Sequence, residues 1–409
     1  MAVKLMAWVD GRGSLRAGQP VCQAAAHTGA WMKPQIGLAL SGGNALGAYA
    51  AGAYAALHRA GMEPQVISGA SIGAVTATLI AGNPPERRVA RLEEFWRQAA
   101  APSIYGGGVP NGWMRDLYNK LQATQALMVG RPGLFRPRPS GFLSLLPGTP
   151  PDVGLFDPLP LVGTLERLVD FDYLNQQGPA VVLTCVDLLD GSPVYFDSRK
   201  QVIEPRHVLA STAFIPGFPP ARIDGRLLGD PGMQANLPLD PLLEAPTGDL
   251  TCFAVDLFDS VGQAPTSMDT ALERAQDILF SAQSLRTIAA VRKARRLQRS
   301  LAEVKSRLAA QAIDLNSLAP WLDDVQVHEL ELVLIAYRAP VHELGAKAME
   351  FSARSIGERW QAGEADMDRA LALHQAGQAT TDDPGFRFYD GRRRDPRTAT
   401  TGANDASAS

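Results

Sequence analysis

Two short apolar segments, each followed by a glycine-containing turn and a run of small residues, constrain the fold of this chain more than any other feature. The first is IGLAL at residues 36–40, which leads through SGGN into ALGAYAAGAYAAL; the second is QVI at 65–67, which leads through SGASIG into AVTATLIAG. In both, the apolar period changes from that of a strand to that of a helix. This succession of strand, helix, strand and helix predicts a mostly parallel sheet covered by helices on both faces.

The rest of the chain extends this pattern. Apolar runs at 179–186, 193–196, 221–226 and 252–257 are typical of further strands, and LLG precedes a turn at Asp230. Beyond Ser267 the pattern predicts one long helix to about residue 311, a strand-like VHELELVLIAYR and a final helix around 353–375.

These patterns divide the chain into regions. We expect an irregular N-terminal extension at 1–35, an α/β domain at 36–262, a mainly helical C-terminal region at 263–375 and a disordered tail at 376–409. Within the domain, residues 101–157 are rich in glycine, proline and aromatic residues. They predict an irregular insert, either a lid that walls an apolar pocket or a poorly ordered surface loop.

Composition limits the classes of function. The chain is 46% hydrophobic and 20% charged with a net charge of -3, which is typical of a soluble globular protein and gives no case for a nucleic-acid partner. No apolar segment is long enough to span a bilayer, and the N-terminus lacks the apolar core of a signal peptide. Cys22, Cys185 and Cys252 are too few for a disulfide framework, and the last two lie in strand-like runs as expected core residues. A cytoplasmic location fits this usage, and nothing indicates the oligomeric state.

The second turn places Ser71 between Gly69 and Gly73 in the pattern G-x-S-x-G. At a strand-to-helix junction this pattern strains the serine backbone and projects its hydroxyl at the carboxyl edge of the sheet. The following helix directs its positive end toward the serine. Small residues that merely fill a tight junction are the alternative, and the pattern alone does not decide between them.

The first turn, Ser41-Gly42-Gly43-Asn44, has the features of an anion-binding loop. Consecutive residues without bulky side chains let backbone N–H groups converge on an anion, as a tetrahedral oxyanion requires. A phosphate-binding loop is the rival interpretation. However, no Gly-Lys-Ser/Thr follows, and GGNALG departs from GxGxxG at its third position.

Asp230 is the best placed candidate for a catalytic base. It follows an apolar run and lies in the tight turn LLGDPGMQANLP, shortly before Asn236. A Ser-Asp-His order would instead need His328, His342 or His374, which lie in or near the helical C-terminal region without a strand-end setting.

Taken in order, SGGNALGAYAAG, GASIG and Asp230-Pro231-Gly232 with a downstream Asn-x-Pro resemble the patatin-like phospholipases, over roughly residues 36–375. The segments VDLFDS, RAQDILFSAQS and EFSARSIGERWQAGEADM resemble a bacterial subgroup with a helical C-terminal extension. The resemblance implies a three-layer α/β/α fold with a helical C-terminal appendage. It implies a serine acyl hydrolase of lipid esters, of the phospholipase A or lysophospholipase type, without metal or organic cofactor. Ser71 would be the nucleophile and Asp230 the proton acceptor. The oxyanion hole would comprise Gly42, Gly43 and Asn44, and the motif glycines would be Gly47, Gly69, Gly73 and Gly232.

Four positions depart from the family pattern. Ser41 and Asn44 stand where the family usually has a third or fourth glycine, Leu46 at a usual arginine, and Pro231 at the glycine after the aspartate. Leu46 removes a positive charge near the oxyanion, and Pro231 removes a backbone donor and fixes φ. Both reacting residues are present. Two alternatives stay open: a Ser-Asp-His esterase of the α/β-hydrolase type, and a catalytically silent scaffold that binds lipid or protein.

Residues 286–307, RTIAAVRKARRLQRSLAEVKSR, predict a basic amphipathic helix. Its basic face is either the solvated face of a helix packed by its apolar stripe, or a surface that attracts anionic headgroups. The second interpretation predicts weak, salt-sensitive peripheral binding at the inner face of the membrane. That binding would depend on Arg292, Lys293, Arg295 and Arg296.

Overall fold

The computed structural model describes residues 34–101, 113–144, 146–150, 152–243, 248–311, 328–340, 343 and 346–392. All but the last two residues of the expected extension at 1–35 lie outside these ranges, as does Cys22. From Pro34 onward the chain forms one compact unit, so the boundary predicted at 262/263 does not separate two bodies.

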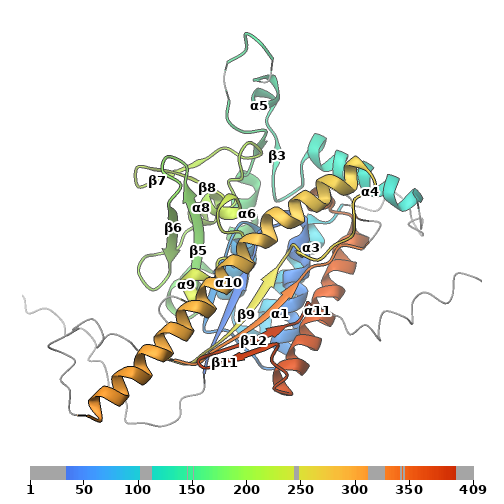
Figure 1. The fold of residues 1–409 in the computed structure, drawn as a ribbon. Helices are drawn as coiled ribbons and strands as arrows, with labels where there is room; N and C mark the ends of the chain where they lie inside the picture. Colours follow the sequence, from blue (N-terminus) through green and yellow to red (C-terminus); the bar gives the residue numbers. More distant parts are fainter. Residues whose placement is uncertain are drawn as a thin grey trace, which may run out of the picture. The chain divides into compact units, whose positions relative to one another are not determined.

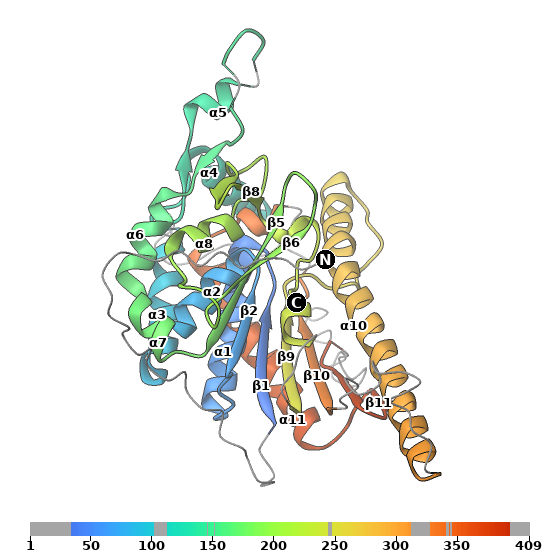
Figure 2. The same ribbon diagram turned by 90° about the vertical axis from the view of Figure 1, so that its left-hand side faces the viewer.

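A ten-stranded, mostly parallel sheet forms the centre of the described chain (Figures 1 and 2). The strand order is β11-β12-β10-β9-β1-β2-β5-β8-β7, and β6 lies beside β5. The parallel strands are β1 (Gln35–Leu40), β2 (Val66–Gly69), β5 (Ala180–Asp187), β9 (Leu250–Asp256), β10 (Leu330–Ala336) and β12 (Phe386–Asp390). The predicted α/β class with a mostly parallel sheet is therefore confirmed.

Both faces of this sheet are buried, which gives three layers. Leu38 and Leu40 join the larger core cluster with the helices α1 (Gly47–Arg59), α2 (Ile72–Ala81), α3 (Pro85–Ala99) and α11 (Ala353–Gln375). Ala39 points to the opposite face and joins a second cluster with α10 (Met268–Ala309). Alternation along one strand thus supplies side chains to both layers. Cys185 and Cys252 are buried in their strands, as predicted.

The small residues of α1 allow another helix to approach at backbone distance. A Cβ atom at Gly52 would lie 2.0 Å from the carbonyl oxygen of Trp360, and one at Gly363 would lie 2.0 Å from that of Tyr49. The C-terminal helix α11 therefore packs directly on the first helix of the fold. None of the helices within the described ranges is long and apolar enough to cross a membrane.

The C-terminal prediction needs correction. The sequence predicts disorder for residues 376–409, but β11 (Thr381–Asp383) and β12 continue the sheet beyond β10. Phe386 and Tyr389 are buried there. A short polar segment such as TTDDPGFRFYD becomes a strand only because β10 offers it an edge with which to pair. The C-terminal region is mainly helical, as expected, yet it is part of the sheet and not an appendage to it.

The insert prediction is also wrong in part, because residues 101–157 contain the 17-residue helix α4 (Trp113–Val129). Its glycine-rich and proline-rich flanks give no hint of a helix of this length.

The remaining elements are η1 (Asn44–Leu46), β3 (Arg136–Pro137), α5 (Pro139–Leu143), β4 (Phe156–Asp157), α6 (Leu159–Leu168), α7 (Phe171–Gln176), β6 (Pro193–Asp197), α8 (Pro205–Ser211), β7 (Ala221–Ile223), β8 (Arg226–Gly229), η2 (Pro231–Met233), α9 (Asp240–Leu243) and η4 (Lys347–Met349).

Candidate active site

The two glycine-containing turns lie side by side because β1 and β2 are neighbours whose carboxyl ends are in register, Leu40 opposite Gly69. Ser71 follows β2 and precedes α2, with φ 54° and ψ -123°. A positive φ is rare for a residue with a side chain and costs about 1–3 kcal/mol. The backbone N–H of Ser71 donates to Ser211 Oγ on α8 (3.1 Å).

Packing explains the two glycines around the serine but not the strain of the serine itself. A Cβ atom at Gly73 would lie 2.2 Å from the carbonyl oxygen of Leu40, and one at Gly69 would lie 2.5 Å from that of Gly73. Only glycine fits at either position. A junction filler would not need Ser71 in a disfavoured conformation, so the strain favours a functional role.

Asp230 directly follows β8 and is buried beside Ser71. Its backbone N–H donates to the carbonyl oxygen of Ala213 (3.0 Å), and its Oδ1 accepts a hydrogen bond from the N–H of Gly232 (2.8 Å). Its Oδ2 has no hydrogen-bond partner within the described chain. Burial raises the pKa of Asp230 to about 6, although the Ser71 hydroxyl and the Gly232 amide both act to lower it. The structure thus brings together the two residues that the sequence analysis proposed as nucleophile and base.

The proline after this aspartate does not disturb it. Pro231 occupies the first position of η2, where a missing N–H costs nothing, and the next amide, that of Gly232, bonds the carboxylate. The departure at Pro231 is therefore compatible with the position of Asp230.

The oxyanion loop contacts Ser71, but one of its expected donors is occupied. A Cβ atom at Gly42 would lie 3.0 Å from the Cβ of Ser71, so no larger residue fits. The N–H of Gly42 donates to the carbonyl oxygen of Asn236 (3.1 Å), which corrects its assignment as an oxyanion donor. The N–H groups of Gly43 and Asn44 have no acceptor in the described part of the chain and remain available.

Asn44 adopts the left-handed conformation that its place in a glycine-rich turn requires, with φ 51°. Asparagine tolerates this region better than most residues. Its side-chain amide donates to the sulfur of Met349 in η4 (3.0 Å). The C-terminal region therefore directly supports the oxyanion loop.

Asn236 links the two halves of the site, a role that the sequence analysis did not assign. It is buried, and its Nδ2 donates to the carbonyl oxygen of Gly42 (3.1 Å). Its backbone N–H donates to Oε1 of Gln283 on α10 (2.9 Å). A Cβ atom at Gly232 would lie 3.1 Å from Asn236 Oδ1 and 3.8 Å from Phe280 of α10. The Asn-x-Pro pattern was the only sequence signal for this linking role of Asn236.

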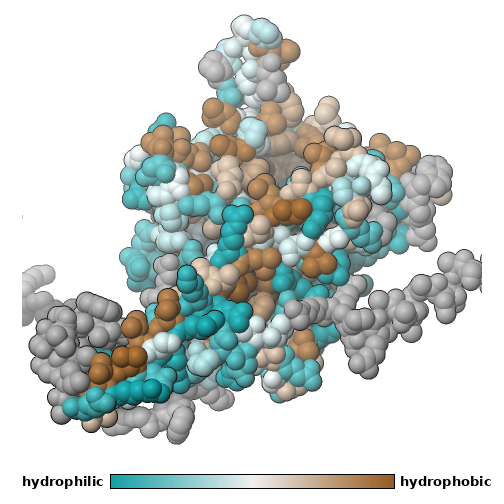
Figure 3. Space-filling view, in the orientation of Figure 1, coloured by the Kyte–Doolittle hydropathy of each residue, from teal (hydrophilic) through white to brown (hydrophobic). Residues whose placement is uncertain are grey.

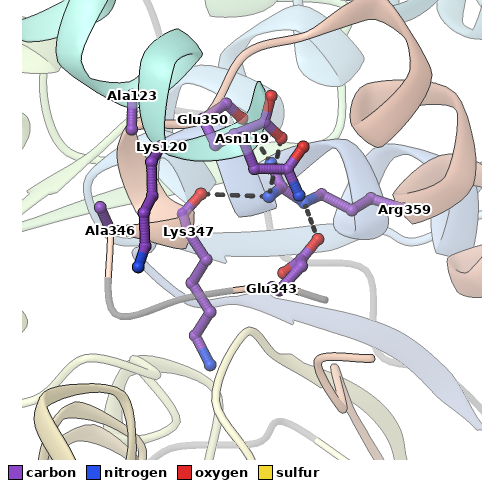
Figure 4. A pocket seen from close by; sticks show the side chains of 8 residues that line it. All are labelled: Asn119, Lys120, Ala123, Glu343, Ala346, Lys347, Glu350 and Arg359. Carbon is purple, nitrogen blue, oxygen red and sulfur yellow. Dashed lines mark hydrogen bonds and ion pairs between the residues drawn. The ribbon is translucent and has the colours of Figure 1, made fainter. Parts of the chain in front are cut away.

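Position 46, where an arginine is usual, carries no charge. Leu46 is buried in the core. Arg359 of α11 contacts the neighbouring residue: its Nη1 donates to the carbonyl oxygen of Ala45 (3.2 Å) and its Nε donates to Glu343 (3.0 Å). Figure 4 shows this guanidinium between Glu343 and Glu350 at a small cavity. These carboxylates compensate its charge, so Arg359 positions η1 and adds no net positive charge there.

The histidines that the structure describes do not complete a triad with Ser71. Nε2 of His374 lies 2.7 Å from Glu331, the second residue of β10, and His328 precedes that strand. Both therefore lie at the amino-terminal edge of the parallel strands, opposite Ser71. His342 lies outside the described residues. His207 accepts the N–H of Glu204 in a helix cap and packs on Phe196.

Comparison with known families agrees with this arrangement. A model described as patatin-like phospholipase matches residues 38–243, half of the chain. The chain belongs to the patatin-like phospholipase family. A second model, described as patatin phospholipase, matches residues 278–383, so the C-terminal region with α10 and β10 also matches a patatin model. The resemblance seen in the sequence is confirmed, and membership places the protein among the lipid acyl hydrolases.

Solved structures give more remote likenesses. VipD from Legionella pneumophila has a TM-score of 0.33 at 14% identity, covering 81% of this chain and 67% of that one. Full-length ExoU with SpcU from Pseudomonas aeruginosa has a TM-score of 0.24 at 17% identity, covering 86% and 72%. Human GIVD cytosolic phospholipase A2 in complex with methyl gamma-linolenyl fluorophosphonate has a TM-score of 0.22 at 16% identity. The match covers 40% of this patatin-like chain and 23% of the human one. No curated protein sequence matched. The family assignment therefore rests on the sequence models.

Proposed function

We propose that this protein hydrolyses an acyl ester of a phospholipid or lysophospholipid, with Ser71 as nucleophile and Asp230 as proton acceptor. The observation that supports this most is a strained serine next to a fully buried carboxylate. Asp230 takes the hydroxyl proton as Ser71 Oγ attacks the ester carbonyl, and the amides of Gly43 and Asn44 stabilise the oxyanion. Asp230 then protonates the leaving alcohol, and water attacks the acyl-enzyme to release the fatty acid and restore the serine.

An aspartate is a weak base, and burial offsets this weakness. The pKa of Asp230 is raised from 3.8 to about 6 because its charged form has lost solvent. A base with a pKa near the working pH transfers protons more efficiently than one that is far more acidic. Oδ2, which lacks a hydrogen bond, keeps a lone pair available for the serine proton.

The pH profile of hydrolysis follows from this pKa. Only the ionised form of Asp230 can accept the proton, so we expect kcat/KM to fall about tenfold per pH unit below about pH 6. Initial rates on a soluble short-chain ester between pH 4.5 and 8, with circular dichroism to verify folding, measure it. A profile that stays flat down to pH 4.5 in folded protein would contradict Asp230 as the base.

Covalent labelling tests the nucleophile directly. A fluorophosphonate probe should form an adduct on Ser71 that peptide mass spectrometry locates. A panel of phospholipids and lysophospholipids should then show release of free fatty acid. Folded protein that neither labels nor hydrolyses any member of the panel would favour the silent scaffold.

The geometry of α10 argues against the four cations proposed to bind anionic lipid. Arg295 is buried and donates to the carbonyl oxygen of Leu243 (3.1 Å), and Arg292 pairs with Asp383 of β11 (2.6 Å). At 1.5 Å per residue, Arg296 lies roughly 20 Å along the helix from Gln283, the residue that contacts the site. Replacing Arg295 would also disturb packing. We therefore assign no membrane contact to this set.

A further inference from the structure

The polarity of α4 is inverted compared with an ordinary surface helix. Arg115, Asn119 and Gln122 are buried together with Tyr118 and two alanines, whereas Leu117 and Met128 are more than half exposed. A helix on the surface of a soluble domain normally buries its large apolar residues. The outward face of α4 is thus unusually apolar for a solvated helix.

Fixed contacts hold the inverted orientation in place. Nη2 of the buried Arg115 lies 2.6 Å from Oε2 of Glu358 on α11. Nζ of Lys120 lies 3.3 Å from Oδ2 of Asp269 in the first turn of α10. Rotating the helix to bury its leucines would break the pairing of Arg115 and leave a buried charge uncompensated. The apolar face is thus kept outward by the fold.

The first half of α10 adds a second apolar stripe beside it. Figure 3 shows hydrophobic side chains gathered over the upper part of this face, where α4 and the beginning of α10 lie. We call these side chains, each more than half exposed, the apolar rim: Leu117, Leu121 and Met128 of α4, and Met268, Leu272 and Leu279 of α10.

The apolar rim borders the candidate active site. α4 packs on η4, whose Met349 accepts a hydrogen bond from Asn44 of the oxyanion loop. One residue after Leu279, Phe280 lies against Gly232, and Gln283 bonds Asn236. The helix α10 therefore touches the loop of Asp230 directly, whereas α4 is connected to the oxyanion loop through η4.

We propose that the apolar rim is the surface by which this protein docks on a lipid bilayer with neutral or zwitterionic headgroups. The inference rests on the proposed function, because a phospholipase must reach an ester that lies in a bilayer. Charge indicates the headgroup: the exposed positions of the described α4 and of α10 up to Leu279 together carry one lysine and no carboxylate. The half-buried carboxylates of this part of α10 are paired with Lys120 and Lys347. Such a face gains from burial of apolar area and little from attraction to anions.

Vesicle sedimentation tests the proposal. Wild-type protein should bind phosphatidylcholine vesicles, with less than about a twofold change between 0.05 and 0.5 M salt, since apolar burial is not screened. A Leu117→Gln, Leu121→Gln, Leu272→Gln variant should bind at least about tenfold more weakly. Its hydrolysis of a soluble short-chain ester should stay unchanged, which also verifies that it folds.

The far end of α10 offers a matched control. Leu297, Leu301 and Val304 are exposed apolar residues of the same helix, well away from the site. Their triple change to Gln should leave vesicle binding intact. Equal loss in both variants, absence of wild-type binding, or binding only to anionic vesicles at low salt would overturn the proposal.

Two further measurements distinguish lipid docking from dimer formation, and docking from hydrolysis. Sedimentation velocity would overturn lipid docking if it showed a dimer that the apolar-rim changes abolish, because the rim would then be a protein interface. Binding is also measured with Ser71→Ala protein, which isolates docking from catalysis. Vesicle binding that depends on the apolar rim, without hydrolysis of any ester by wild type, would refute the proposed function and leave the docking surface standing.

Discussion

Replacing Ser71 with alanine is expected to lower the rate of ester hydrolysis by at least about 10⁴-fold, because no described neighbour can form the acyl-enzyme in its place. The fold should be retained with little change in stability. Ser71 is only partly buried, and its backbone at φ 54° is strained whichever side chain it carries. Fatty-acid release and fluorophosphonate labelling measure the loss, and a thermal melt measures the fold.

Ser211→Ala is the matched control for this change. Ser211 lies next to the nucleophile and accepts its N–H, so its loss loosens the turn without removing the attacking oxygen. We expect a decrease of about tenfold, from one lost hydrogen bond of about 1 kcal/mol and some misplacement. If Ser71→Ala retained more activity than Ser211→Ala, the serine would be structural and the proposed mechanism would fail.

Replacing Asp230 with asparagine is expected to abolish hydrolysis and to stabilise the protein. The amide cannot accept the serine proton, so activity should fall by about 10³-fold or more. The oxygen of the new amide would still accept the N–H of Gly232, and the substitution would no longer bury a charge. The pKa of Asp230 is raised in the folded state, so its contribution to unfolding free energy is unfavourable above about pH 6 and vanishes below about pH 3.8. Two pKa units correspond to about 3 kcal/mol, the upper limit of the gain at pH 8.

The variant Asp256→Asn separates the loss of activity from the gain in stability that we expect for Asp230→Asn. Asp256 is also buried, and desolvation raises its pKa to about 6, but its Oδ2 accepts a hydrogen bond from Ser284 (2.7 Å) and it does not touch Ser71. Its replacement should leave kcat within about tenfold of wild type. Chemical denaturation at pH 8 and at pH 5 measures stability for both variants. An active Asp230→Asn protein, or equal loss of activity at Asp256, would refute the Ser–Asp dyad.

The amino-acid sequence by itself determined the class of fold and the location of the candidate site. Both follow from local patterns: the change of apolar period at Leu40 and at Ile67 marks strand-to-helix junctions, and those junctions of parallel strands must share one edge of a sheet. Gly69 and Gly73 could be recognised because only glycine fits so close to a backbone. Asp230 was singled out because it follows an apolar run and lies in a tight turn shortly before Asn236.

Only the tertiary structure decided which groups remain available and which surfaces lie outward. The N–H of Gly42 is occupied by the carbonyl of Asn236, a residue 194 positions away, and no local pattern shows that these two groups bond to each other. The strand β12 exists because β10 provides an edge, and the leucines of α4 face outward because Arg115 is paired with Glu358 on a distant helix. A hydrogen bond or ion pair between distant segments outweighs local propensity when the alternative is a buried polar group without a partner.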